Sequence, residues 1–279
     1  MSNQEIMKWT DLSGKTAVIT GGSGVLGGEI VSFLANSGAN IAVIDINDTA
    51  GEQIVNKINS ELGSDQAIFI KCNVLDKTDI VKSAGKVMGV FGGVDFLING
   101  AGGNKPEATT GQDKSFFDIP EEALRFVTDL NLTSTILSSQ VYGKIFAEKK
   151  QGIILNISSV NAFRPLTRIP AYSAAKAAVS NFTQWLAVHM AKEYSPEIRV
   201  NAIAPGFFLT EQNKFLLIDN DTGELTERGK TIIEHTPVGR FGAPDDLFGT
   251  VLWLLSPASS FVTGIVVPVD GGFSAFSGV

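Results

Sequence analysis

The stretch Thr16-Ala-Val-Ile-Thr-Gly-Gly-Ser-Gly-Val-Leu-Gly-Gly28 joins a short apolar run to a glycine-rich turn. Its first five residues predict a buried β-strand, and the glycines allow a sharp change of direction after it. Beyond the turn, Leu26, Ile30 and Leu34 recur at helical spacing, which predicts a helix over about residues 24–37 with one face on a sheet. A strand, a glycine turn and a helix in this order indicate the start of an α/β fold.

Further apolar runs follow, most of them separated by helical patterns. These runs cover residues 41–45, 67–71, 94–98, 152–157, 198–202 and 265–269. The alternation predicts a Rossmann-like, doubly wound parallel sheet of about seven strands with helices on both faces. Because no repeat or linker interrupts it, residues 1–279 are expected to form a single domain.

Two segments, residues 102–120 and 207–237, depart from the strand and helix rhythm. Loops of this length in a compact domain are usually functional or disordered. Both follow strand ends, on the side where open α/β sheets bind ligands. We therefore expect substrate-side loops, one of which could serve as a lid.

Charge and composition exclude several classes of protein. The chain has 22 basic and 29 acidic residues, a net charge of −7, which argues against nucleic acid or anionic membrane as a partner. Cys72 is the single cysteine, and His189 and His235 lie far apart, so no metal site is expected. No signal peptide or bilayer-spanning stretch is recognisable, which favours a cytoplasmic location.

The glycine turn has the features of a phosphate-binding loop. Glycines there let the backbone approach a pyrophosphate, whose charge is stabilised at a helix N-terminus. The prediction is dinucleotide binding, and the alternative is a tight connection that binds nothing. The expected contacts in this loop are Gly21, Ser23, Gly24, Val25, Leu26 and Gly27.

Asp45 ends the second predicted strand, about twenty residues beyond the turn. A carboxylate there can accept hydrogen bonds from both ribose hydroxyls of adenosine, and it repels a 2′-phosphate. Residues 46–49 contain no Arg or Lys to receive such a phosphate, so NAD is expected rather than NADP. The alternatives are a solvated loop carboxylate or a cap for a helix beginning near Asp48.

Tyr172 and Lys176 are four residues apart, so both side chains share one helix face. A phenol has an ordinary pKa of about 10, and a nearby ammonium lowers that pKa. Such a tyrosine could exchange a proton with an alcohol or a ketone. Alone, this spacing is common, and an exposed helix pair is the alternative. Trp185, further along the helix, is expected on its apolar side.

Six motifs occur in one order along the chain: the glycine loop, Asn99-Gly-Ala-Gly102, Asn131, Ser158-Ser159, Tyr172 with Lys176, and Pro205-Gly206. In this combination the sequence resembles the short-chain dehydrogenase/reductase family, from about Leu12 to Gly272. The resemblance implies a Rossmann-like fold, NAD(P)-dependent hydride transfer at a CH–OH group, and a homotetramer.

The resemblance also implies roles for four residues. Tyr172 matches the catalytic acid/base, and Lys176 matches the lysine that binds nicotinamide ribose and lowers the pKa of the tyrosine. Ser159, thirteen residues before Tyr172, matches the serine that hydrogen-bonds the reacting oxygen. Asn131 matches the asparagine that holds a water in the proton relay, with a buried, satisfied amide as the alternative.

Other positions match the family's cofactor contacts. Besides the glycine loop they are Asp45, Ile46, Asn73, Val74, Asn99, Gly100, Ala101, Gly102, Tyr172, Lys176, Pro205, Gly206, Phe207 and Thr210. The chain departs from the usual pattern at three places: Asn73 replaces Asp, Gly100 replaces Asn, and Val25 replaces a glycine. Asn73 can still accept a hydrogen bond from an adenine amine.

Residues 158–170 run from the predicted serine towards the predicted tyrosine and should line a substrate pocket. Arg164 and Arg168 could grip a carboxylate through paired hydrogen bonds. Asn161 and Asn104 are suited to hydroxyl groups, and Ser159 would complete the substrate contacts. Alternatively, the arginines pair with acidic residues at the surface or at a subunit contact.

Stretches 161–172, 205–213 and 270–279 resemble the D-mannonate oxidoreductase (D-fructuronate reductase) group of the family. A polar, carboxylate-bearing substrate suits the arginines and amides. Gluconate 5-dehydrogenation is the nearest alternative, and 3-ketoacyl reduction is disfavoured by Asp45 and the negative charge. A different class, an inactive NAD-binding sensor, is disfavoured because Ser159, Tyr172, Lys176 and Asn131 are all present.

Overall fold

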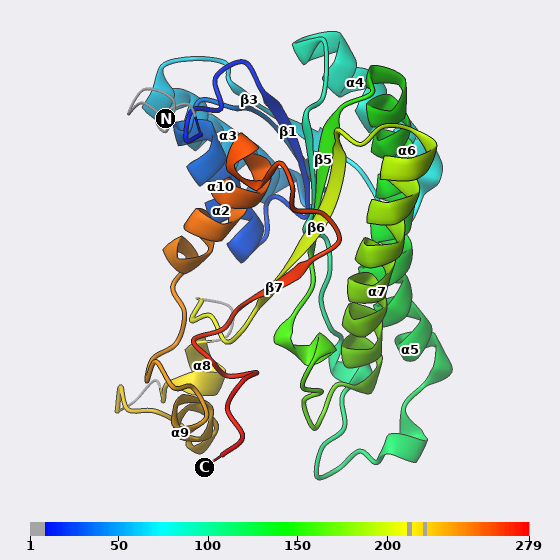
Figure 1. Ribbon diagram of the computed structural model, residues 1–279. Helices are drawn as coiled ribbons and strands as arrows, with labels where there is room; N and C mark the ends of the chain where they lie inside the picture. The colour runs from blue at the N-terminus through cyan, green and yellow to red at the C-terminus, as the bar shows by residue number, and fades with distance from the viewer. Residues whose placement is uncertain (1–8, 211–213, 220–221, 279) are drawn as a thin grey trace.

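A computed structural model describes residues 9–210, 214–219 and 222–278 of the chain. Over these residues the chain forms one parallel sheet with the strand order β3-β2-β1-β4-β5-β6-β7 (Figure 1). The strands are β1 (Thr16–Thr20), β2 (Asn40–Asp45), β3 (Ala67–Lys71), β4 (Phe96–Asn99), β5 (Gly152–Ile157), β6 (Ile198–Pro205) and β7 (Val266–Val269). The doubly wound, Rossmann-like architecture predicted from the sequence is confirmed as a single α/β domain.

Two apolar cores, one on each face, hold the helices to the sheet (Figure 1). On one face lie α2 (Val25–Asn36), α3 (Asp48–Leu62) and α10 (Phe248–Leu255). On the other lie α4 (Lys77–Phe91), α6 (Ser134–Lys149) and α7 (Pro170–Glu193). Because both faces are covered, the central strands read as continuous apolar runs rather than as alternating ones.

The order of the strands places a crevice at the carboxyl edge of the sheet. Strand β1 pairs with β2 on one side and with β4 on the other, so the chain reverses its direction of winding there. Open α/β sheets bind ligands at such a reversal. Helices α8 (Lys214–Leu217) and α9 (Glu227–Glu234) and the C-terminal segment lie together at one end of the molecule (Figure 1).

The two segments predicted as substrate-side loops contain little regular structure. Residues 102–120 hold two short 3₁₀ helices, Pro106–Ala108 and Phe116–Asp118, before α5 (Glu121–Thr128). Residues 207–237 hold α8 and α9, and residues 211–213 and 220–221 of this segment lie outside the described residues, as do residues 1–8 and 279 of the predicted domain. Other 3₁₀ helices are Val160–Ala162, Pro244–Leu247 and Pro257–Ser259.

Within the described ranges, no helix combines the length and the apolar character needed to cross a membrane.

Candidate functional site

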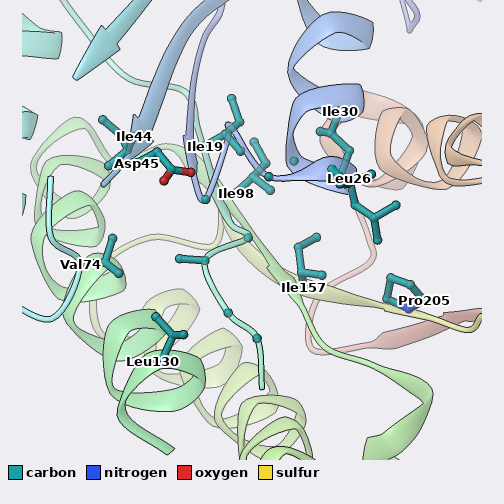
Figure 2. Close-up of a pocket in the computed structure, with 18 of the residues that line it drawn as sticks. Ile19, Leu26, Ile30, Ile44, Asp45, Val74, Ile98, Leu130, Ile157 and Pro205 are labelled. Atoms are coloured by element: carbon teal, nitrogen blue, oxygen red, sulfur yellow. The ribbon is translucent and has the colours of Figure 1, made fainter. Parts of the chain in front are cut away.

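A cavity of about 610 Å³ opens at the carboxyl edge of the sheet. In Figure 2, Asp45 and Val74 lie on one side of it and Pro205 on the opposite side. All the predicted cofactor contacts line the cavity except Ser23 and Asn99. The lining members are Gly21, Gly24, Val25, Leu26, Gly27, Asp45, Ile46, Asn73, Val74, Gly100, Ala101, Gly102, Tyr172, Lys176, Pro205, Gly206, Phe207 and Thr210.

The glycine turn is packed too tightly for side chains. A Cβ added to Gly27 would lie 2.2 Å from the carbonyl oxygen of Gly21, and Gly21 itself has a φ of +66°. Helix α2 begins after Gly24, which supplies no side-chain cap. At the glycine turn, the cavity wall therefore consists of backbone without side chains, next to the N-terminus of α2. This arrangement suits a pyrophosphate.

The carboxylate of Asp45 is held by three backbone N–H groups. One oxygen accepts from Ser23 at 3.1 Å, and the other accepts from Ile46 at 2.7 Å and Asn47 at 3.1 Å. The contact with Ser23 ties the glycine turn to the end of β2. The side chain of Asn47, and not Asp45, caps α3 by accepting from Ala50. The carboxylate is thus fixed at the rim of the cavity.

A cation that the sequence analysis missed lies beside this carboxylate. Lys71 on β3 is in register with Asp45 on β2, although the two residues are far apart in the chain. Its ammonium pairs with Asp48 at 2.5 Å on the surface. The pairing of β2 with β3 brings Lys71 next to Asp45. The residues that directly follow Asp45 in the sequence give no sign of this neighbour.

Asn131 is fully buried in a π-helical turn, Asp129–Thr133, between α5 and α6. Its Nδ2 donates to the carbonyl oxygens of Gly103 at 2.7 Å and Val127 at 2.8 Å, and its Oδ1 accepts from the N–H of Gly103 at 3.1 Å. Such widened turns are frequent at functional sites. This amide fixes the chain just after β4 and is satisfied by the protein itself.

Tyr172 and Lys176 lie at the start of α7. Lys176 is 4% exposed, and its Nζ lies 5.6 Å from the centre of the Tyr172 ring. Burial lowers the pKa of Lys176 to about 8. Burial also raises the pKa of Tyr172, and a hydrogen bond with Ser159 opposes this rise in part. The predicted lowering of the tyrosine pKa is therefore wrong here, because loss of hydration outweighs the hydrogen bond with Ser159.

The two adjacent serines face different partners. Ser158 bonds to α7, through the carbonyl oxygen of Lys176 at 3.1 Å and the hydroxyl of Ser180 at 2.7 Å. Ser159 lies on the side of Tyr172, and its Oγ also accepts from the Nδ2 of Asn161 at 3.3 Å. Of the two, Ser159 is the serine placed beside the tyrosine hydroxyl.

Asn161 holds together the segment between the serine and the tyrosine. Its Oδ1 accepts from the N–H of Leu166 at 3.1 Å and from the hydroxyl of Ser173 at 3.3 Å. The residue is buried, and its amide is engaged at both ends. Asn161 thus shapes the loop that carries Ser159.

None of the five predicted substrate contacts is among the residues that line the large cavity: Ser159 and Asn161 lie behind Tyr172, and the other three lie elsewhere. Arg164 is exposed, and its Nε donates to the carbonyl oxygen of Ser274 at 3.1 Å. Arg168 is exposed, and its carbonyl oxygen accepts from Thr110. Asn104 donates to the hydroxyl of Thr109 at 2.7 Å and lines a separate, open cavity. The structure does not bring the two arginines to Tyr172.

Several residues of the cavity were not predicted. Gly103, Phe126 and Leu130 line it near the catalytic motifs, and Cys72 lines it near Asn73. Phe126 and Leu130 are four residues apart just before Asn131, a spacing that places them on one helical face. This helical spacing is the sequence feature that could have identified Phe126 and Leu130 as cavity residues. Within the described ranges, no cluster of three or more His, Cys, Asp or Glu could hold a metal.

Comparisons with known proteins identify the family. Residues 23–274 match the sequence profile described as enoyl-(acyl carrier protein) reductase. An uncharacterized oxidoreductase, UxuB, of Bacillus subtilis is 48% identical over 96% of this chain and 98% of its own. Two Escherichia coli K12 enzymes, a 7α-hydroxysteroid dehydrogenase and a 5-keto-D-gluconate 5-reductase, are each 33% identical over 94% of this chain and over 94% and 96% of their own lengths, respectively.

A solved structure from Haemophilus influenzae, with bound NAD, has the same fold with a TM-score of 0.91. Its assignment as a D-mannonate oxidoreductase is provisional; it is 45% identical and covers 98% of this chain and 100% of its own. The relatives share the architecture and differ in their named substrates. Together with the cavity and its motifs, these matches show that the chain belongs to the short-chain dehydrogenase/reductase family of oxidoreductases.

Proposed function

We propose that this chain is an NAD(H)-dependent oxidoreductase that interconverts D-mannonate and D-fructuronate. The observation that carries the proposal is that Asp45, the glycine turn, Tyr172 and Lys176 line one continuous cavity. The name of the Haemophilus influenzae relative supports the choice of substrate. A homotetramer remains part of the proposal, and sedimentation velocity tests it.

The residues of the cavity fit NAD. The bare backbone at Gly21 and Gly27 leaves room for a pyrophosphate, and the fixed carboxylate of Asp45 is suited to two ribose hydroxyls. The same carboxylate disfavours a 2′-phosphate. When bound, the nicotinamide accepts a hydride from the alcohol or donates one to the ketone.

In the oxidative direction, the substrate loses a hydride from carbon 5 of mannonate, counted from the carboxyl carbon, and a proton from the attached oxygen. Tyr172 first gives up its own phenolic proton, and the resulting phenolate takes the proton of the alcohol, while Ser159 hydrogen-bonds the oxygen throughout. In the proposed relay, Lys176 and Asn131 pass on the proton that leaves Tyr172. Reduction of fructuronate follows the same steps in reverse, with Tyr172 giving the proton.

A second sugar acid is the main alternative. The 33% identity to a 5-keto-D-gluconate 5-reductase supports gluconate 5-dehydrogenation by the same residues. A 3-ketoacyl reductase would be expected to prefer NADP, against which Asp45 argues. A role as an inactive NAD-binding sensor is weaker still, because the acid/base tyrosine and its lysine are both in place.

The test follows loss of NADH absorbance with purified protein and D-fructuronate. Parallel reactions use NADPH, 5-ketogluconate and an acetoacetyl thioester. Rapid oxidation with fructuronate and NADH alone is the expected result. Turnover of 5-ketogluconate instead would change the substrate assignment and leave the assignment of the catalytic residues unchanged. Binding of NADH without turnover of any of these would contradict the proposed activity.

A further inference from the structure

Lys105 carries a positive charge next to the wall of the large cavity. Its Nζ lies 4.0 Å from the centre of the Phe126 ring, a cation–π contact, and Phe126 lines the cavity together with Tyr172 and Lys176. The side chain is half-buried. In the described part of the chain, Lys105 forms no ion pair with a carboxylate, so its charge is free for a ligand.

The same small apolar cluster supports Phe126 and Tyr172. Both rings pack against the buried residues Ala108, Ala123, Val127 and Ala171. Phe126, which contacts the ammonium of Lys105, and Tyr172, the proposed acid/base, are therefore packed against the same apolar cluster. The ammonium of Lys105 therefore lies against a ring that lines the same cavity as Tyr172.

The backbone of Lys105 is held on both sides. Before it, Gly103 exchanges two hydrogen bonds with the buried amide of Asn131. After it, the carbonyl oxygen of Lys105 accepts from the N–H of Ala108 at 3.0 Å and from the hydroxyl of Thr109 at 2.9 Å. Lys105 also lines a second cavity, of about 610 Å³, together with Asn104 and Leu216. The backbone that carries this charge is therefore fixed. Lys105 lines the second cavity, whereas Phe126, the ring under its ammonium, lines the large one.

We propose that Lys105 is the specificity-determining residue that binds the carboxylate of the substrate. The inference rests on the proposed function and assigns the carboxylate to Lys105 in place of the predicted Arg164 and Arg168. The Nε of Arg164 donates to the carbonyl oxygen of Ser274 in the C-terminal segment. An ammonium is a compact point charge that can meet a carboxylate at several angles. Partial burial beside the Phe126 ring strengthens that attraction compared with an exposed lysine.

The experiment compares Lys105→Met, Lys105→Arg and Arg164→Met in the full chain. Methionine keeps an unbranched side chain over Phe126 and removes only the charge. With fructuronate and NADH, Lys105→Met is expected to raise KM by about 10- to 100-fold with little change in kcat. Lys105→Arg should restore most of the affinity, and Arg164→Met should leave KM unchanged. With D-fructose, which has CH₂OH in place of the carboxylate, Lys105→Met should have no effect.

A binding measurement separates this inference from the proposed activity. D-mannonate is titrated calorimetrically into protein saturated with NADH, a complex that cannot react. The wild type could bind mannonate without turning over fructuronate, and Lys105→Met could lose that binding. This result would contradict the proposed activity and support Lys105 as the residue that binds the carboxylate. Unchanged binding in Lys105→Met, a KM increase in Arg164→Met alone, or no binding of mannonate by the wild type would each overturn the anchor.

Discussion

The ammonium of Lys176 donates a hydrogen bond of 2.8 Å to the carbonyl oxygen of Ile157, the last residue of β5. A backbone carbonyl orients the charge but does not neutralise it. No carboxylate within the described residues forms an ion pair with Lys176, and burial lowers its pKa from 10.5 to about 8. The site therefore holds a buried lysine that releases its proton far more readily than a solvated one.

This shift predicts how stability depends on pH. Below pH 8 the lysine is charged in both the folded and the unfolded chain, and burying the charge costs free energy. Between pH 8 and pH 10.5 the unfolded chain binds more protons, so stability rises with pH through this group. Relative to Lys176→Met, the free energy of unfolding should rise by about 3 kcal/mol across that window.

Urea unfolding of both proteins from pH 7 to pH 10.5 measures this difference. Other groups titrate in both chains and cancel in the comparison. A difference that stays constant with pH would contradict the lowered pKa. Lys176→Met should also lose oxidoreductase activity, because the proposed proton route is broken.

Tyr172→Phe separates chemistry from stability. Removing the hydroxyl should reduce kcat with fructuronate by about 100- to 10,000-fold, since the acid/base is lost. The ring remains packed, so the melting temperature should change little. Tyr142→Phe is the matched control, because that hydroxyl is fully buried and bonded to Ser83 at 2.8 Å away from the cavity. Full activity in Tyr172→Phe would refute the assignment.

Gly102→Ala tests the close contacts behind the catalytic pair. A Cβ there would lie 2.6 Å from the Oδ1 of Asn131 and 3.2 Å from the Nζ of Lys176. Both side chains would have to shift, so kcat should fall by about 100-fold, the effect of a misplacement of about 1 Å. Gly85→Ala, in α4 with no atom within 4 Å of the new Cβ, should keep activity and gain about 0.5–1 kcal/mol of stability. Steady-state kinetics and urea unfolding check both variants.

The strands and the cavity lining could be predicted because they depend on local patterns. An apolar run bounded by turn residues fixes a strand, and parallel strands bring their carboxyl ends to one edge. Asn131 shows the limit of such reasoning. Its motif indicated a site, but the π-helical turn and the two bonds to Gly103 depend on packing between distant segments.

Side-chain direction was the least predictable feature. Trp185 was expected on the apolar side of α7, yet it is 57% exposed and stacks on His189 at 4.8 Å. Arg164 and Lys105 are both cations near the predicted site in sequence, and only the fold shows which lies over Phe126. Local spacing determines which residues share a helix face, whereas the neighbouring elements determine whether that face is covered.

Asp45→Asn tests the choice of cofactor at constant size. Loss of the charge should raise KM for NADH by about 10- to 100-fold, because charge-assisted bonds to ribose hydroxyls are lost and the new NH₂ faces the N–H of Ser23. KM for NADPH should fall, since Lys71 lies in register on the next strand. Asp48→Asn removes an equal charge, bonded to Lys71 instead of Ser23, and should leave KM for NADH unchanged. Equal effects of the two variants would mean that general electrostatics, and not the bonded carboxylate of Asp45, selects the cofactor.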